Sequence, residues 1–277
     1  MSSVKKNLLY NMAYQILILI VPLITVPYVS RALGAENIGI YSYTYSIVYY
    51  FMLIAMLGIN NYGNRTIAKS RDNKEELSRN FLGIYSIQFT LSIIMIAIYL
   101  FFISRFEKKY TLIGYIQVIY LISNALDINW FFFGIEKFKL TVTRNAMIKI
   151  ISLICILLFV KNRDDLVIYT LILSGSTLIC QLILPYFLKK EISLVKITKE
   201  DIFKHIKPCL ILFMPVIAVS LYKVMDKIMI EKLSNVIEVG YYEQAEKIIN
   251  IPIGIITALG TVMLPKISNL VQKNEDS

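Results

Sequence analysis

The residues that build most metal and redox sites are scarce in this sequence of 277 residues, which contains one histidine, one tryptophan and three cysteines. No Cys-x-x-Cys pair occurs. Because Cys155, Cys180 and Cys209 all lie among apolar residues, we expect small buried side chains and no disulfide framework. A single histidine, His205, gives little basis for a metal site, a haem site or histidine-based catalysis. The sequence therefore predicts no metal and no organic cofactor.

Charge is also in short supply. Charged residues make up 17% of the chain and hydrophobic residues 57%, with a mean hydropathy of +0.63, a balance that one soluble core of this size could not bury. A helix needs about 20 predominantly apolar residues to cross a bilayer. Stretches of about this length predict an all-α integral membrane protein with about eight transmembrane helices, at residues 8–29, 38–59, 81–103, 110–134, 141–160, 166–188, 209–230 and 239–264. Barrel strands would alternate apolar and polar residues, which residues 91–102 do not do.

The basic residues of the loops predict the orientation. Nineteen Lys and Arg residues fall on the side that carries the N-terminus, and seven fall on the other. Because positive loops stay in the cytoplasm, we expect a multi-pass protein of the plasma membrane with both termini cytoplasmic. Anionic lipid beside these loops accounts for the net charge of +10, so no nucleic-acid partner is expected.

Two short tracts suggest an internal repeat. Leu33-Gly-Ala-Glu-Asn-Ile-Gly-Ile-Tyr41 aligns with Leu233-Ser-Asn-Val-Ile-Glu-Val-Gly-Tyr-Tyr242 when one residue is inserted. The six crossings between the copies make this a parallel repeat, a common plan in transporters. It divides the chain into a first six-helix lobe, residues 1–207, and the first two helices of an incomplete second lobe, residues 208–277.

Five tracts spread along the chain carry a resemblance to a known family. They are Pro27-Tyr-Val-Ser-Arg-Ala-Leu-Gly34, Gly58-Ile-Asn-Asn-Tyr-Gly-Asn-Arg-Thr-Ile-Ala68, Asp127-Ile-Asn-Trp-Phe-Phe-Phe-Gly-Ile-Glu136, Tyr222-Lys-Val-Met-Asp-Lys-Ile-Met-Ile230 and Gly240-Tyr-Tyr-Glu-Gln-Ala-Glu-Lys247. They resemble the bacterial polysaccharide repeat-unit flippases of O-antigen and capsule synthesis, which belong to the multidrug, oligosaccharidyl-lipid and polysaccharide exporter superfamily. Members of that family have more helices than this chain supplies.

The resemblance implies a function. It implies a flippase, not an enzyme, that turns an undecaprenyl-diphosphate-linked oligosaccharide from the cytoplasmic to the outer leaflet. Membrane lipids, a polysaccharide polymerase and a chain-length regulator are the other partners it implies. The alternatives are a cation-coupled multidrug antiporter of the same superfamily, a membrane enzyme and a non-transporting scaffold of the polysaccharide assembly complex. The short outer loops speak against the enzyme.

Ionisable residues at membrane depth are costly, so they are the candidate site residues. Lys223, Asp226 and Lys227 are spaced so that one Asp could neutralise one Lys and leave a positive charge for a diphosphate. The alternative is an internal ion pair with one Lys extending to the outer interface. Both interpretations stay open at this point.

Three further residues complete the candidate set. Lys247 is expected to pair with Glu243, or to face the cavity as a substrate ligand. Arg31 lies at the outer end of the first crossing, as an interfacial anchor or a phosphate ligand. Asp127 could bind H⁺ or Na⁺ and couple transport to a gradient, or pair with Arg31 or with a lysine of the seventh crossing.

Tyrosine is abundant, with nineteen residues. A dense group lies in the second crossing, at Tyr41, Tyr43, Tyr45, Tyr49 and Tyr50. Aromatic faces stack on sugar rings, but tyrosine also populates membrane interfaces without a ligand, and we expect interfacial residues to outnumber ligands.

Overall fold

The computed structural model describes the backbone of residues 3–193 and 195–275 and the side chains of residues 17, 18, 20–193, 195–254 and 256. Over these residues the chain is helical and contains no strand, which confirms the all-α prediction. The elements in order are α1 (Ser3–Met56), α2 (Ile59–Ser70), α3 (Lys74–Ile103), α4 (Lys108–Ala125), α5 (Asn129–Gly134), α6 (Phe138–Phe159), a 3₁₀ turn η1 (Arg163–Asp165), α7 (Leu166–Leu182), α8 (Leu184–Glu191), α9 (Lys199–Leu233) and α10 (Val236–Glu275).

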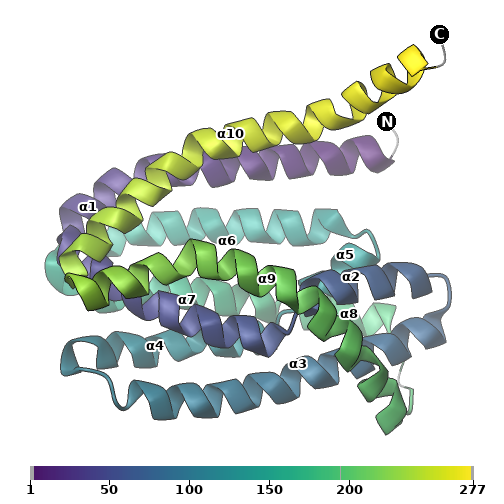
Figure 1. Ribbon diagram of the computed structural model, residues 1–277, viewed down its shortest axis with the longest axis horizontal. Helices are drawn as coiled ribbons and strands as arrows, with labels where there is room; N and C mark the ends of the chain where they lie inside the picture. Colours follow the sequence, from purple (N-terminus) through teal and green to yellow (C-terminus); the bar gives the residue numbers. More distant parts are fainter. Residues whose placement is uncertain (1–2, 194, 276–277) are drawn as a thin grey trace.

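The long helices run back and forth between two ends of the molecule (Figure 1). Within the described residues, 6 stretches are long and apolar enough to cross a membrane, the first of them Ile20–Ser70. That first stretch contains the whole of one predicted crossing, residues 38–59, and the last part, residues 20–29, of another, residues 8–29. The predicted crossing at residues 239–264 lies partly outside the described side chains, so the number eight stays a prediction. Helix α1 begins and α10 ends at the same end of the bundle (Figure 1).

A sharp bend divides α1 into two crossings. Gly34 has φ 73° and ψ 168°, a conformation that costs glycine little and a residue with a Cβ much more. A Cβ at this position would also lie 3.5 Å from the guanidinium of Arg163, which covers the bend. Asn37 fastens the same corner, because its side chain donates a hydrogen bond to the Arg163 carbonyl at 2.6 Å.

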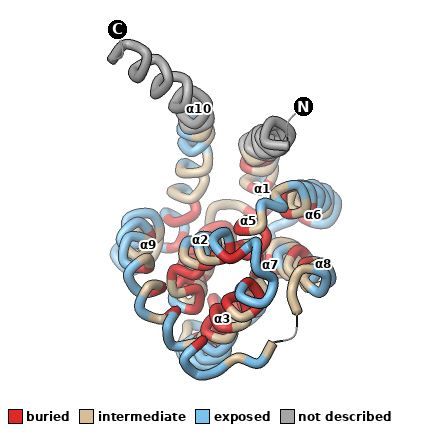
Figure 2. Tube along the Cα trace, turned by 90° about the vertical axis from the view of Figure 1, so that its right-hand side faces the viewer, coloured by how far each residue is buried: buried red, intermediate tan, exposed pale blue. Residues whose placement is uncertain are grey.

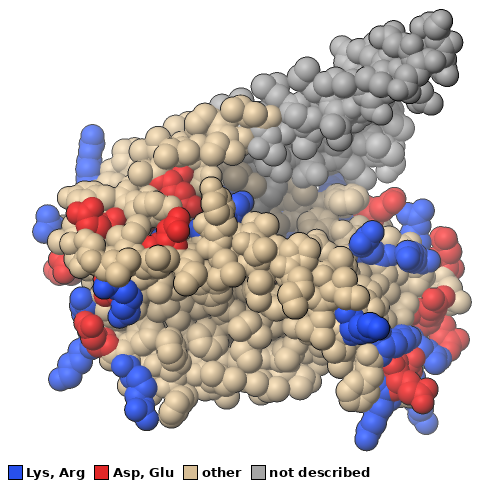
Figure 3. All heavy atoms as spheres, viewed as in Figure 1, with Lys and Arg blue, Asp and Glu red and all other residues tan. Residues whose placement is uncertain are grey.

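Charged side chains gather at the two ends of the bundle and leave an uncharged belt between them (Figure 3). This is the distribution expected of a protein whose middle lies in hydrocarbon. The belt exposes large apolar side chains on α3, α6 and α9, among them Phe101 at 66%, Leu158 at 57% and Met214 at 64% exposed. The chain is therefore a multi-pass membrane protein.

The buried core has two layers, one toward each end of the bundle. One layer is rich in tyrosine and packs Tyr99, Tyr110 and Tyr120 against α1. The other layer surrounds the single tryptophan, Trp130, which stacks on Phe81 with ring centroids 5.5 Å apart. Buried residues gather in the middle of the helix bundle, while the outer side of α9 is exposed (Figure 2).

Helices α1 and α10 cross with their backbones in direct contact. A Cβ added at Gly39 would clash with the carbonyl oxygen of Val236, and one added at Gly240 would clash with that of Ala35. Small residues at such a crossing permit close helix packing in membranes. The contacts are reciprocal, and the two glycines come from the two tracts that suggested the repeat. A twofold axis along the membrane normal produces such a pair, although the division of the chain at residue 207 stays a prediction.

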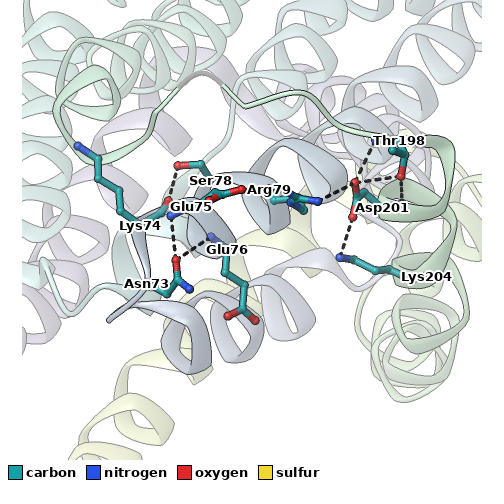
Figure 4. Close-up of polar contacts among 9 residues, drawn as sticks. All are labelled: Asn73, Lys74, Glu75, Glu76, Ser78, Arg79, Thr198, Asp201 and Lys204. Atoms are coloured by element: carbon teal, nitrogen blue, oxygen red, sulfur yellow. Dashed lines mark hydrogen bonds and ion pairs between the residues drawn. The ribbon is translucent and has the colours of Figure 1, made fainter.

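Helix α9 begins before the predicted crossing at residues 209–230, and polar contacts at its start explain why (Figure 4). Thr198 and Asp201 form a capping box, in which the Thr198 side chain accepts a hydrogen bond from the Asp201 backbone N–H and the Asp201 carboxylate accepts one from the Thr198 backbone N–H. Asp201 also lies 3.2 Å from the Lys204 ammonium and 3.9 Å from the guanidinium of Arg79 on α3. The capped polar turns thus extend the helix beyond its apolar part.

Candidate functional site

A cavity of about 290 Å³ lies at membrane depth between α1, α6, α7 and α10. We call it the central cavity. Its wall contains side chains of several chemical types: the apolar residues Val21, Pro22, Leu153, Ile156 and Leu173, the hydroxyl residues Thr25, Tyr41, Tyr45, Ser152 and Tyr169, and the ionisable residues Lys149, Glu243 and Lys247.

Tyrosines from two helices, α1 and α7, form one side of the central cavity. The Tyr41 ring lies 5.1 Å from Tyr169 and 5.9 Å from Tyr45, centroid to centroid. The hydroxyls of Tyr41 and Tyr120 share a hydrogen bond of 2.7 Å, which fixes the ring of Tyr41 against α4. Residue spacing selects these members of the tract, since Tyr41 and Tyr45 lie one helical turn apart while Tyr43 points into the core against Tyr110.

Carboxylates and ammonium groups alternate along the contact of α9 with α10. The Lys227 ammonium lies 2.6 Å from Glu243 and 2.8 Å from Glu246, and the Lys247 ammonium lies 3.0 Å from Glu243. Ser42 on α1 donates a hydrogen bond of 2.5 Å to Glu243. Two positive charges thus face two negative charges, and we call these five residues the ion network.

The structure changes the predicted pairing around Asp226. Lys227 pairs with Glu243 and Glu246 on α10, not with Asp226, whose carboxylate accepts a hydrogen bond of 2.6 Å from the Tyr242 hydroxyl. Neighbours at i and i+1 point in different directions on a helix, which separates Asp226 from Lys227. Lys223 is exposed and is not among the residues that line the central cavity.

The other predicted site residues have different outcomes. Lys247 pairs with Glu243 as predicted and also lines the central cavity. Arg31 is exposed, lies close to the Gly34 bend and does not line the central cavity. Asp127 pairs with neither Arg31 nor a lysine of α9 within the described residues. Instead its carboxylate accepts hydrogen bonds from the backbone and side chain of Asn129, at 2.9 and 2.7 Å, at the start of α5.

Lys149 is the cavity residue that the sequence interpretation missed. Counting loop charges assigns it to the cytoplasmic side, whereas the structure places it midway along α6, half-buried and in the wall of the central cavity. No hydrogen bond or ion pair joins its ammonium to another described residue. The available signal was its position inside a predicted crossing, between Ile148 and Ile150.

No cluster of three or more His, Cys, Asp or Glu side chains suited to a metal occurs among the described residues. What the cavity offers is hydroxyls, aromatic faces and two ammonium groups, one of them neutralised.

A family model described as polysaccharide biosynthesis protein matches residues 4–271. The chain belongs to this family. The family assignment suits an arrangement that can bind an anionic, hydroxyl-rich solute without covalent chemistry.

Two curated relatives carry the name "Putative O-antigen transporter". The one from Escherichia coli K12 is 25% identical over 280 residues, covering 98% of this chain and 66% of the relative. The one from Shigella dysenteriae is 24% identical over 271 residues, covering 96% and 68%. A solved structure named "protein A" shares the fold, with a TM-score of 0.67 at 17% identity over 95% of this chain and 64% of that one. The chain thus spans about two thirds of the length of these proteins.

Proposed function

We propose that this chain is part of a transporter that moves an oligosaccharide repeat unit, linked to undecaprenyl diphosphate, from the cytoplasmic to the outer leaflet of the plasma membrane. The observation that carries the proposal is the central cavity, which combines tyrosine faces with the unpaired ammonium of Lys149 at membrane depth. The curated relatives named as O-antigen transporters support the same substrate class.

The chemistry of the cavity matches the two parts of such a substrate. Tyr41, Tyr45 and Tyr169 offer ring faces and hydroxyls to sugars. Lys149 and Lys247 offer ammonium groups to the diphosphate, whose charge would otherwise be costly to move through hydrocarbon. The lipid tail needs no site, because it stays in the bilayer. In this proposal the N-terminal side faces the cytoplasm, and the family's second lobe closes the cavity.

A cation-coupled drug antiporter is the alternative transporter. Its cationic substrates would favour a cavity lined by carboxylates. The central cavity has two lysines and one glutamate, and that glutamate already pairs with Lys227 and Lys247. The balance of charge therefore favours an anionic substrate, whereas coupling of transport to H⁺ or Na⁺ remains part of the proposal for either substrate.

Complementation tests the proposal. The chain, as it stands and extended by any reading frame that follows it, is expressed in a strain that lacks its polysaccharide flippase. Surface polymer and lipid-linked units inside the cell are then measured. We expect restored export, lost in Lys149→Met but kept in Lys223→Met, an exposed lysine outside the cavity. Normal export by Lys149→Met at equal membrane abundance would contradict the assigned site. Correct insertion without export by either form would favour a scaffold.

A further inference from the structure

A second cavity, of about 320 Å³, lies between α6 and α7. It shares Lys149, Ser152 and Leu173 with the central cavity and continues from there toward α5. We call it the amide chamber, because the side chains of Asn129, Asn145 and Gln181 line it together with Lys149. The amide chamber lies on the side of α6 opposite its exposed apolar residues, so it faces the bundle interior.

A buried arginine sets the direction of the amides. The Arg144 side chain is 5% exposed. It donates hydrogen bonds to the Asn145 Oδ1 atom at 3.2 and 2.8 Å and to the Asn129 Oδ1 atom at 2.8 Å. A guanidinium has donors and no acceptor, so each amide must turn its oxygen toward Arg144 and its NH₂ group away from it.

Asn129 in turn sets the orientation of the Gln181 amide. The Asn129 NH₂ group donates to Asp127 Oδ1 at 2.7 Å and to Gln181 Oε1 at 3.4 Å. The oxygen of Gln181 is therefore occupied as well. The Cys180 thiol adds a further donor to the Asn145 oxygen, at 3.2 Å. Every amide oxygen that lines the chamber thus accepts a hydrogen bond from the protein.

What the amides and Lys149 offer to a ligand is a set of donors. The NH₂ groups of Asn145 and Gln181 and the ammonium of Lys149 have no hydrogen-bond or ion-pair partner within the described part of the chain. Unpaired donors at membrane depth are unfavourable unless something accepts from them. A group with several acceptor oxygens and a negative charge satisfies all three.

We infer that the amide chamber is an oxyanion-binding subsite, with Asn145, Gln181 and Lys149 as its ligands and Arg144 as the positioning residue that turns the amides. The inference rests on the proposed function for its substrate, of which the oxyanion would be a part. Two parts of a lipid-linked repeat unit have this chemistry: the carboxylate of an acidic sugar and the diphosphate. An ionised oxygen accepts stronger, charge-assisted hydrogen bonds from these donors than a neutral hydroxyl does, so the lining favours an anion over a neutral sugar.

Binding to the purified full chain in lipid nanodiscs tests the inference. Glucuronate, glucose and inorganic pyrophosphate are the probes, because glucuronate and glucose differ at one carboxylate. Fluorescence of the single tryptophan, Trp130, beside Asn129 reports binding, and calorimetry checks it independently. We expect anions to bind at least about tenfold more tightly than glucose, as charge-assisted hydrogen bonds imply. Preference for glucuronate assigns the chamber to the sugar carboxylate, and preference for pyrophosphate assigns it to the carrier.

Asn145→Asp is the decisive variant. One carboxylate oxygen still accepts from Arg144, which preserves the packing, but a second oxygen replaces the NH₂ donor. We expect a loss of anion affinity of about tenfold or more. Asn61→Asp, at an exposed position of α2, makes the same charge change elsewhere and should bind like the parent. Anion binding unchanged in Asn145→Asp, or no anion preference in the parent by either method, would overturn the inference.

The binding assay separates this inference from the proposed function. If export is never restored but anion binding still depends on Asn145, the chamber stands and the transport proposal fails. If export depends on Lys247 while Asn145→Asp binds anions and exports normally, the transport proposal stands and the chamber fails.

Discussion

The α1–α10 contact and the α6–α7 contact treat polar groups in opposite ways. At the first, two glycines bring the backbones together, and Ser42 of α1 joins the ion network that links α10 to α9, in which every charge has an opposite charge within 3.0 Å. At the second, the helices leave the amide chamber open, and Lys149 has no carboxylate partner among the described residues. Where a membrane protein pairs its buried charges, the charges support the structure, and where it leaves one unpaired, a ligand is the natural partner.

The largest expected effect is at the glycine crossing. Gly39→Leu would drive a side chain into the backbone of α10 at Val236, so we expect no folded protein in the membrane. The control is Gly175→Leu on α7, where a Cβ would meet nothing within 4 Å. Limited proteolysis of membranes compares the two. Equal resistance would show that the two helix contacts do not differ in packing.

Next is the carboxylate at the centre of the ion network. Glu243→Gln removes a charge shared by Lys227 and Lys247, and breaking a buried pair costs about 3–5 kcal/mol. Unfolding in denaturing detergent measures the loss. Glu238→Gln, at an exposed position of the same helix, should change stability little. Adding Lys247→Met to Glu243→Gln should recover part of the loss, and no recovery would argue against pairing as its cause.

Lys149→Met should change stability in the opposite direction, by stabilising the protein. The variant removes an unpaired charge at membrane depth, so we expect a gain of about 2 kcal/mol, somewhat less than the insertion cost of a lysine. The same variant should lose polymer export. Detergent unfolding and surface polymer are measured on the same preparation. A variant that loses stability and export together would mean that Lys149 supports the fold.

The smallest effects come from a pair of serines. Ser42→Ala removes a hydrogen bond to the charged Glu243 and should cost about 1.5 kcal/mol. Ser176→Ala removes a hydroxyl that only lines the amide chamber and should change stability by less than about 0.5 kcal/mol. Unfolding curves of the two variants under one condition make the comparison. Equal losses would contradict the claim that polar groups support the structure at α10 but not in the amide chamber.

Much of the helical layout follows from the sequence because the bilayer imposes a length on every crossing. The predicted stretch at residues 141–160 is close to α6, and the stretch at 166–188 covers α7 with most of α8. Boundaries are displaced where polar capping continues a helix beyond its apolar part, as at Thr198 and Asp201. The break between α4 and α5 was not predicted, because residues 110–134 are predominantly apolar even with Asn124, Asp127 and Asn129 at the break.

The candidate site was harder to predict than the helices. Spacing within one helix correctly paired Glu243 with Lys247. The same reasoning missed the link of Lys227 to Glu243 and Glu246, since a contact between α9 and α10 depends on the rotation of both helices. Asp127 likewise found its partner two residues away, at Asn129, through a local turn that charge counting does not consider.

The sequence by itself determined that this chain is helical, lies in a membrane and belongs to its family, because hydropathy is a sum over residues and the family tracts are linear. Only the tertiary structure decided which polar groups meet. The sequence does not distinguish Lys149 from the other lysines, whereas the packing of α6 and α7 places it in one cavity with Asn145 and Gln181. Partnership depends on distances of a few ångströms between helices, and those distances follow from how side chains pack across the whole bundle.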